Sequence, residues 1–431
     1  MLTAFGRAFR TPDLRRKLLF TLAMLGLYRL GSLVPGPGVS YVAIQRCLKG
    51  VEGNSLYGLV NLFSGGALLQ LSVFALGIMP YITSSIIVQL LIVVIPRLET
   101  LKEEGQSGQA KLTQYTRYLT VALAILQSTG IIALARSNRL FPSCNESIIP
   151  NDGLFTILVL VLTLTSGTAV IMWLGELVTD RGVGNGMSVL IFTSIISSIP
   201  AGALRLYRQP NGLFLLAAIA LLAAVVITLV VFVEQAQRRV PVQYAKRMIG
   251  RRMYGGTSTY IPLKVNQAGV IPVIFASSLL YLPQLLGNVF PNNRAFAGFV
   301  NRYLVRGDHP LYLLLYFGLI VFFTYFYVAI TFNPVEVSDN MKKYGGFVPG
   351  IRPGRATAEY LDYILSRITA FGALYLGLVA VLPYLLFNLT AGNNQFPFGG
   401  TAVLIIVGVG LETVKQIESQ LMLRNYEGFL R

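Results

Sequence analysis

Residues 53–96 read GNSLYGLVNLFSGGALLQLSVFALGIMPYITSSIIVQLLIVVIP, and this uncharged run decides the fold of the chain. A helix that spans a bilayer needs about 20 apolar residues, so the run is too long for one span and too short for two spans with a loop. Ser64, Gly65 and Gly66 interrupt it. We therefore expect a short half-helix over Leu56–Phe63, a glycine hinge, and a full span over Gln70–Ile95.

Irregular backbone at membrane depth is tolerated only where protein buries it or where it lines a water-filled cavity. The broken run therefore predicts a membrane protein with an aqueous interior. The composition agrees, because 54% of the 431 residues are hydrophobic and only 12% are charged.

Ten apolar runs are long enough to span a bilayer, which predicts an all-α polytopic protein. The fifth run is weak, because it contains several serines and Pro200, so we expect it inside the bundle rather than facing lipid. The ten runs cover Leu18–Val34, Gln70–Ile95, Tyr118–Ala135, Leu154–Leu174, Met187–Leu204, Leu213–Val233, Ala268–Phe290, Leu311–Phe332, Ile368–Phe387 and Thr401–Ile417.

The basic residues predict the orientation, since cytoplasmic loops carry an excess of Lys and Arg. With ten spans, both termini and the loops after spans 2, 4, 6 and 8 lie on one side. These segments, together with Lys415 near the end of the tenth span, hold 25 of the 35 Lys and Arg residues, the opposite loops hold 9, and Arg29 lies inside the first span. Both termini are therefore expected in the cytoplasm. Whether Arg29 faces the bundle or the interface stays open.

Ten spans can divide into two halves of five, and an odd number of spans in each half means that related halves are inverted relative to each other. The polar segment around residues 201–212 is the natural divide. We expect a cytoplasmic segment over residues 1–17, an N-terminal half over 18–204, an inter-half loop over 205–212, a C-terminal half over 213–417, and a cytoplasmic tail over 418–431.

Two of the predicted cytoplasmic loops, residues 234–264 and 333–367, are longer than helix connections require. In the first loop, RRMYGGTSTY is typical of a hairpin, with Gly255 and Gly256 supplying the positive φ angles of a tight turn. In the second loop, KKYGGFVPGIRPGR is rich in glycine and proline, which favours an ordered, irregular tip rather than a helix.

Motifs for catalysis and for ion coupling are missing. The sequence has no HExxH motif and no nucleophile beside a plausible base, and its single histidine, His309, precedes a proline in a polar loop. The glycine-rich stretch at residues 182–186 follows a predicted span rather than a strand, so it fails the context test for a phosphate loop. No carboxylate lies near the middle of a span, which argues against an ion-coupled transporter without excluding one.

Branched apolar residues recur at helical spacing within the spans. Ile78 and Ile82 share one face of the second span, and Met187 and Ile191 share one face of the fifth. Ile274 lies in the seventh span and Ile405 in the tenth. Such residues form either ordinary bundle core or a hydrophobic constriction that gates a pore by dewetting. Their spacing alone does not choose between these readings.

Six motifs, in unchanged order, resemble the SecY family, the channel subunits of bacterial and plastid protein translocases. The resemblance extends from about Arg10 to the end of the chain. The motifs are LFSGGALLQLSVFALGIMPYITSSIIVQLL, QYTRYLTVALAILQS, WLGELVTDRGVGNGMSVLIF, VQYAKRMIGRRMYGG, PLKVNQAGVIPVIFASS and FNPVEVSDNMKKYGGFVPGIRPG.

The resemblance implies an hourglass channel between two inverted halves, with a plug, a pore ring and a lateral gate between spans 2–3 and 7–8. Met187 departs from the isoleucine that is commonest in the ring. The positions that match the plug and its hinge are Leu56, Tyr57, Leu59, Val60, Leu62, Phe63, Ser64, Gly65 and Gly66. The ring positions are Ile78, Ile82, Met187, Ile191, Ile274 and Ile405.

Other positions are assigned by the resemblance to gating and docking. Gln89, Thr120 and Asn266 are polar residues on the gate helices, where they make either ordinary interhelical hydrogen bonds or bonds that set how easily the gate opens. The positions that match basic docking sites for the ribosome or the SecA motor are Arg251, Arg252 and Arg352.

The function expected from this resemblance is a passive, gated channel that passes unfolded polypeptide and releases signal or transmembrane segments into lipid. It is not expected to be an enzyme or to need a cofactor or metal. The implied partners are SecE-like and SecG-like small subunits, SecA, the ribosome, signal-bearing polypeptides and the lipid bilayer. The implied location is the bacterial plasma membrane, with the thylakoid membrane as the other choice. A broken-helix transporter of a small solute is the main alternative, and pairing of Cys47 with Cys144 stays open.

Overall fold

In the computed structural model the chain is mostly helical. The structure describes Phe9 and residues 11–48, 64–136, 148–150, 153–207, 212–244, 247–249, 252–254, 258–289, 298–304, 309–389 and 400–427. The helices are α2 (Pro12–Leu33), α3 (Tyr41–Leu48), α5 (Met79–Val94), α6 (Pro96–Glu103), α7 (Gln106–Arg136), α8 (Leu154–Arg181), α9 (Gly186–Tyr207), α10 (Gly212–Gln235), α11 (Ile271–Val289), the π-helix η1 (Val300–Leu304), α13 (Pro310–Thr331), α14 (Pro334–Lys343), α15 (Arg355–Leu389) and α16 (Gly400–Glu427).

Each of the ten predicted spans overlaps one of these helices. Within the described residues, seven helices are long and apolar enough to cross a membrane, and α5 with α6 counts as an eighth if this pair, bent by 101°, is one span. The remaining two predicted spans correspond to α2, which carries Arg29, and to α11, whose apolar stretch Ile271–Leu280 is short. The chain is therefore a multi-pass helical protein.

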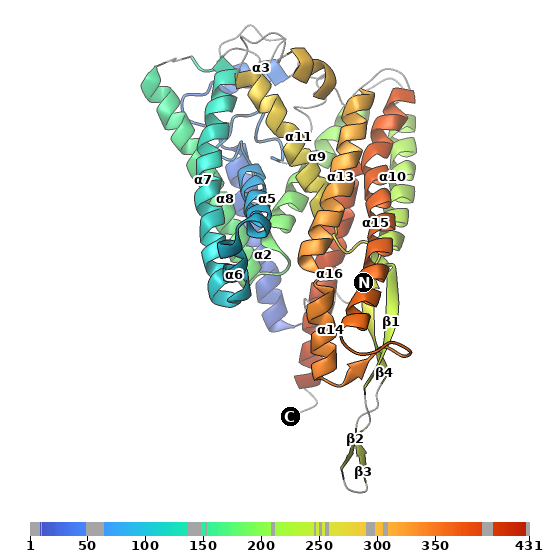
Figure 1. Cartoon of the computed structure of the whole chain (residues 1–431). Coiled ribbons are helices and arrows are strands. Elements are labelled where there is room, and N and C mark those ends of the chain that lie inside the picture. Colours follow the sequence, from blue (N-terminus) through green and yellow to red (C-terminus); the bar gives the residue numbers. More distant parts are fainter. Residues whose placement is uncertain are drawn as a thin grey trace.

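The helices form one bundle with two sides. Figure 1 shows α5, α7 and α8 at one side and α10, α13 and α15 at the other, with α9 and α11 between them. Helix α11 packs against α5 and α7, and α9 packs against α10 and α16, so these helices join the two sides. The largest apolar cluster lies here, and it takes buried residues from α5, α9, α11, α13, α15 and α16.

The described loop segments lie at two ends of the bundle, in the grouping that ten spans predict. Helices α6 and α14, the strands and the end of α16 lie at one end, and α3 lies at the other (Figure 1). Helix α6 belongs to the loop after span 2, β1–β4 belong to the loop after span 6, and α14 and β5 belong to the loop after span 8. The end of α16 belongs to the C-terminal region, and α3 belongs to the loop after span 1. Which end faces the cytoplasm stays a prediction.

The second predicted span is wrong at its start. Helix α5 begins at Met79 rather than near Gln70, and residues 64–78 form turns instead. Leu71 and Gly77 have positive φ angles of 44° and 57°, which a right-handed helix cannot contain. Pro80 then fits the first turn of α5, because its missing N–H would have no partner in that turn anyway.

This irregular stretch is covered by protein. Ala67, Leu68 and Leu71 are at most 2% exposed, and Ser72 pairs with Pro35 in an isolated β-bridge. The backbone N–H of Val73 also donates to the carbonyl of Val34 at 2.9 Å. The polar backbone groups that a helix would satisfy internally are thus partly satisfied by the segment after α2.

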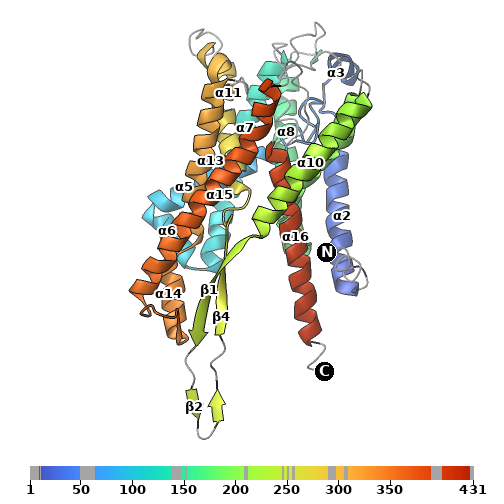
Figure 2. The same cartoon turned by 90° about the vertical axis from the view of Figure 1, so that its right-hand side faces the viewer.

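The two long loops fold together into one small sheet beyond the bundle (Figure 2). Strands β1 (Gln237–Tyr244) and β4 (Ser258–Lys264) of the first loop pair antiparallel, and β5 (Gly346–Phe347) of the second loop pairs with β1 in the order β4-β1-β5. Apolar residues of both loops and of the start of α15 form a cluster under this sheet, including Val240, Leu263, Met341, Val348 and Ile364. The ordered, irregular tip predicted for the second loop is confirmed.

The hairpin predicted within residues 251–260 is wrong, because its two arms pair with other strands and not with each other. Strands β2 (Arg247–Ile249) and β3 (Arg252–Tyr254) pair antiparallel, with Ile249 opposite Arg252. Residues 250–251, between these two strands, lie outside the described residues. Gly255 and Gly256 follow β3 in the sequence, and they also lie outside the described residues.

Candidate functional site

Five of the six predicted ring positions are buried in one apolar cluster. Ile82 lies on α5 with Ile78 at its N-cap, Ile191 lies on α9, Ile274 on α11 and Ile405 on α16. All five isoleucines are at most 7% exposed and belong to the same apolar cluster. Residues that are more than 300 positions apart in sequence thus share one apolar cluster.

Met187, the sixth ring position, packs partly buried against this cluster. Its Sδ atom fills the space that a side chain at Gly175 of α8 would take. The longer, unbranched side chain of methionine therefore extends between α9 and α8, where glycine leaves room for it.

The hinge residues Ser64, Gly65 and Gly66 lie against α2 and α9. Gly65 and Gly66 have φ angles of 64° and 93°, a region that favours glycine. The guanidinium of Arg29 donates to the carbonyl oxygen of Gly65 at 2.5 Å, and Gly65 lies close to Ser194 of α9. Arg29 therefore faces the bundle. The plug positions before the hinge, Leu56, Tyr57, Leu59, Val60, Leu62 and Phe63, lie outside the described residues.

The hinge is further supported by Tyr28, the residue before Arg29. Tyr28 is 1% exposed, its hydroxyl is 2.6 Å from the Ser194 Oγ, and its ring stacks on Phe74 with a centroid distance of 6.0 Å. Sequence reasoning missed this contact, because Tyr28 and Ser194 are far apart in the chain.

Two of the three predicted gate residues, Gln89 and Thr120, lie on the gate helices α5 and α7, whereas Asn266 precedes α11. Thr120 of α7 is buried, and its hydroxyl donates to the carbonyl of Thr116 in its own helix at 2.7 Å. Asn266, just before α11, is also buried and donates to Glu234. Gln89 on α5 is half-buried. Within the described part of the chain, no hydrogen bond joins any two of these three side chains.

The predicted docking arginines belong to the two long loops, outside the three-stranded sheet. Arg352 is exposed in the turn between β5 and α15, where its carbonyl accepts from the Thr357 hydroxyl at 2.9 Å. Arg252 is in β3, and Arg251 lies outside the described residues. Helix α14, which precedes β5 and the segment carrying Arg352, lies toward the same end of the molecule as β2 (Figure 2).

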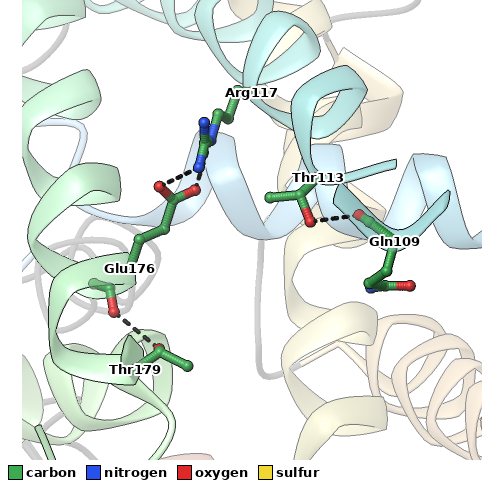
Figure 3. A network of polar contacts seen from close by, with 6 residues as sticks. Gln109, Thr113, Arg117, Glu176 and Thr179 are labelled. Carbon is green, nitrogen blue, oxygen red and sulfur yellow. Dashed lines mark hydrogen bonds and ion pairs between the residues drawn. The ribbon is translucent and has the colours of Figure 1, made fainter. Parts of the chain in front are cut away.

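An ion pair that the sequence did not reveal joins α7 and α8 (Figure 3). Nε and Nη2 of Arg117 donate to the two carboxylate oxygens of Glu176 at 2.8 and 2.7 Å. One helical turn further along α8, the Thr179 hydroxyl accepts from the N–H of Gly186 at the start of α9. The position of Glu176 near the end of an apolar run is the signal that could have pointed to it.

His309 has a structural role in this fold. Its Nδ1 atom accepts from the N–H of Leu311 at 3.1 Å and so caps α13. Its ring packs edge-on against Tyr303 at 5.0 Å. Among the described residues, no three His, Cys, Asp or Glu side chains are grouped so that they could hold a metal ion.

Cys47 takes part in a disulfide, and Cys144 is the other cysteine of the chain. Cys47 is 2% exposed and packs among residues from α7 and α8, such as Ile132 and Leu160. Cys144 itself lies outside the described residues.

The family model named SecY matches residues 72–414, a range that includes all six ring positions. The chain belongs to the SecY family. Curated relatives agree over the full length of both chains. This chain is 63% identical over 437 residues to the protein translocase subunit SecY of Streptomyces galbus. It is 59% identical over 442 residues to that of Mycobacterium tuberculosis.

Solved structures show the same SecY fold at low sequence identity. A structure described as a protein conducting channel has a TM-score of 0.66 at 18% identity, covering 94% of this chain and 91% of that one. A structure concerned with the plug domain of the SecY protein has a TM-score of 0.64 at 19% identity, with the same coverages. Sec61 in a canine ribosome-channel complex has a TM-score of 0.62 at 19% identity, again with the same coverages.

Proposed function

We propose that the chain is the channel subunit of a bacterial protein translocase, which passes unfolded secretory polypeptides across the membrane. The observation that carries the proposal is that five isoleucines at the predicted ring positions are buried in one apolar cluster, in a chain of the SecY family. A chain passing between the two sides of the bundle would have to part these residues.

The chemistry of the ring suits such a pore. Isoleucine and methionine side chains carry no charge and no strong hydrogen-bonding group, so they hold every passing residue weakly. When the pore is empty, the same side chains close against each other and exclude water, which is how hydrophobic constrictions block ions. Met187 adds an adaptable side chain to this closure.

The plug and the lateral gate complete the proposed mechanism. Residues 56–63 would close the channel, and the Ser64–Gly66 hinge would let them leave while α5 stays in place. The lateral gate would open where α11 packs against α5 and α7, with Gln89, Thr120 and Asn266 near that seam. An apolar signal segment would favour the open state because it can contact lipid and the gate helices together.

Energy for transport would come from partners, since nothing in the sequence suggests a catalytic centre of its own. Arg251, Arg252 and Arg352 would dock the SecA motor, or the ribosome through salt-sensitive phosphate contacts. SecE-like and SecG-like small subunits would stabilise the two inverted halves, residues 18–204 and 213–417. The complex would lie in the plasma membrane, with both termini in the cytoplasm.

Reconstitution into proteoliposomes tests the proposal. The channel with its small subunits should move a signal-bearing precursor into the vesicles when SecA and ATP are added, and should not do so without ATP. Uptake of a small solute driven by an ion gradient, with no movement of the precursor, would instead support the broken-helix transporter.

A further inference from the structure

The β1–β4 hairpin is closed at its base by a contact between the end of α10 and the segment that leads into α11. Glu234 precedes β1 by three residues, and Asn266 follows β4 by two. The Nδ2 atom of Asn266 donates to Oε1 of Glu234 at 2.5 Å, and the N–H of Val265 donates to the carbonyl of Ala236 at 3.0 Å. These two hydrogen bonds therefore join the two ends of the hairpin, where the chain leaves the bundle and where it returns. We call this junction the crossing.

The orientation of Asn266 depends on Glu234. The Asn266 side chain is only 2% exposed, and its Nδ2 atom has two acceptors, Oε1 of Glu234 and the carbonyl of Gly269 at 3.1 Å. Its Oδ1 atom is buried and has no hydrogen-bond partner. Gly269 belongs to the same short segment as Asn266, so Glu234 is the acceptor that ties this side chain to another element.

Glu234 lies where several helices meet. Lys415 of α16 and Lys264 of β4 are near enough for their charges to act on its carboxylate, and Tyr375 of α15 lies within range of the Glu234 charge. A hydrogen bond to a carboxylate is stronger than one to a neutral acceptor. The crossing is thus held by a charge-assisted bond in partly buried surroundings.

We propose that Glu234 is a positioning residue that couples the β1–β4 hairpin to α11 through Asn266. The inference rests on the proposed function, in which a partner docks on this hairpin and α11 forms one side of the lateral gate. Helix α11 packs directly on α5 and α7, so a movement of its start changes the gate. When the partner displaces the hairpin, a rigid crossing transmits that displacement to the start of α11. Without the bond, the partner still docks, but its motion reaches the gate less completely.

The test uses the complete channel complex in proteoliposomes and measures precursor translocation against SecA concentration. The variants are Glu234→Ala, Asn266→Ala, the double variant, and Glu234→Gln, which keeps an acceptor oxygen for Asn266. Glu412→Ala is the matched control, because Glu412 is an exposed carboxylate of α16 near Glu234 that does not bond to Asn266. Rates are normalised to folded channel, measured by size-exclusion chromatography and thermal melting.

We expect Glu234→Ala to lower the maximal rate about tenfold, the lower end of the range for a hydrogen bond to a charged group, with an unchanged half-saturating SecA concentration. Glu234→Gln should recover most of the rate, Glu412→Ala should match the wild type, and the double variant should be no slower than either alanine variant alone.

An unchanged maximal rate in Glu234→Ala would overturn the inference, as would a shifted half-saturating SecA concentration, which would place Glu234 in the docking surface. The inference would also be contradicted if the loss of maximal rate in the double variant equalled the product of the losses in Glu234→Ala and Asn266→Ala. If the wild-type complex itself moves no precursor, the proposed function fails rather than the coupling.

Discussion

Placing a carboxylate in the ring is the most direct perturbation of the proposed seal. Ile274 is 7% exposed and packs in the apolar cluster with the other ring isoleucines, so Ile274→Asp puts a charge where no described neighbour can pair with it. The penalty for an unpaired buried charge is several kcal/mol. The closed, dry ring is disfavoured by that amount relative to a hydrated one.

The expected size of the effect follows from this penalty. If only about 3 kcal/mol of it acts on the closed state, the hydrated fraction of channels rises about 100-fold, since each 1.4 kcal/mol changes an equilibrium tenfold. Resting ion conductance in planar bilayers, without any precursor, should rise accordingly. Discrimination against precursors with defective signal sequences should weaken in the same variant.

A matched control separates a pore residue from ordinary core. Ile320 of α13 is 0% exposed and belongs to the same cluster, but it is not a ring position. Ile320→Asp should lower the melting temperature without raising conductance. Equal conductance in the two variants, or no rise in Ile274→Asp, would refute the reasoning and make the ring ordinary packing.

Three further predictions concern the docking face, the disulfide and the ion pair. Arg352→Glu should reduce SecA-driven translocation severalfold while melting stays nearly unchanged, because Arg352 is exposed; a large loss of melting temperature would make it structural. Reductant should change the electrophoretic mobility of the purified chain, because Cys47 is in a disulfide, and equal mobility would contradict the bond. Arg117→Ala should lower stability in a melting assay by about 0.5–1 kcal/mol, since Arg117 is half-exposed and the bond is screened. Adding Glu176→Ala should then cost little more, whereas a further loss of similar size would argue against the pairing.

Hydropathy predicted most of the fold, because a membrane span is set by one local property, the length of an apolar run. Each of the ten apolar runs found in this way overlaps a helix of the structure. The start of α5 was missed because the uncharged run continues through residues that are not helical. Leu71 has a positive φ of 44° although it is a leucine, and nothing in a hydropathy pattern marks that conformation.

Contacts between distant residues were the least predictable part of the site. The Arg117–Glu176 pair, the Tyr28–Ser194 contact and the bond from Glu234 to Asn266 each depend on how separate helices pack. The hairpin predicted within residues 251–260 was wrong because two candidate turns lie a few residues apart, and only the register Ile249 to Arg252 distinguishes them. The ring positions came from the family resemblance, since isoleucines at helical spacing are common in any bundle.

The pairing of β1 with β5 limits how this chain can be recombined with its relatives. Gln243 pairs with Phe347, and Tyr244 pairs with Gly346, so the two long loops share one sheet and one apolar cluster. A chimaera that takes only one loop from a distant relative would bring together strand edges and side chains that were never selected to fit. Exchanging residues 234–264 and 333–367 as a single cassette should preserve folding where exchanging either loop alone does not.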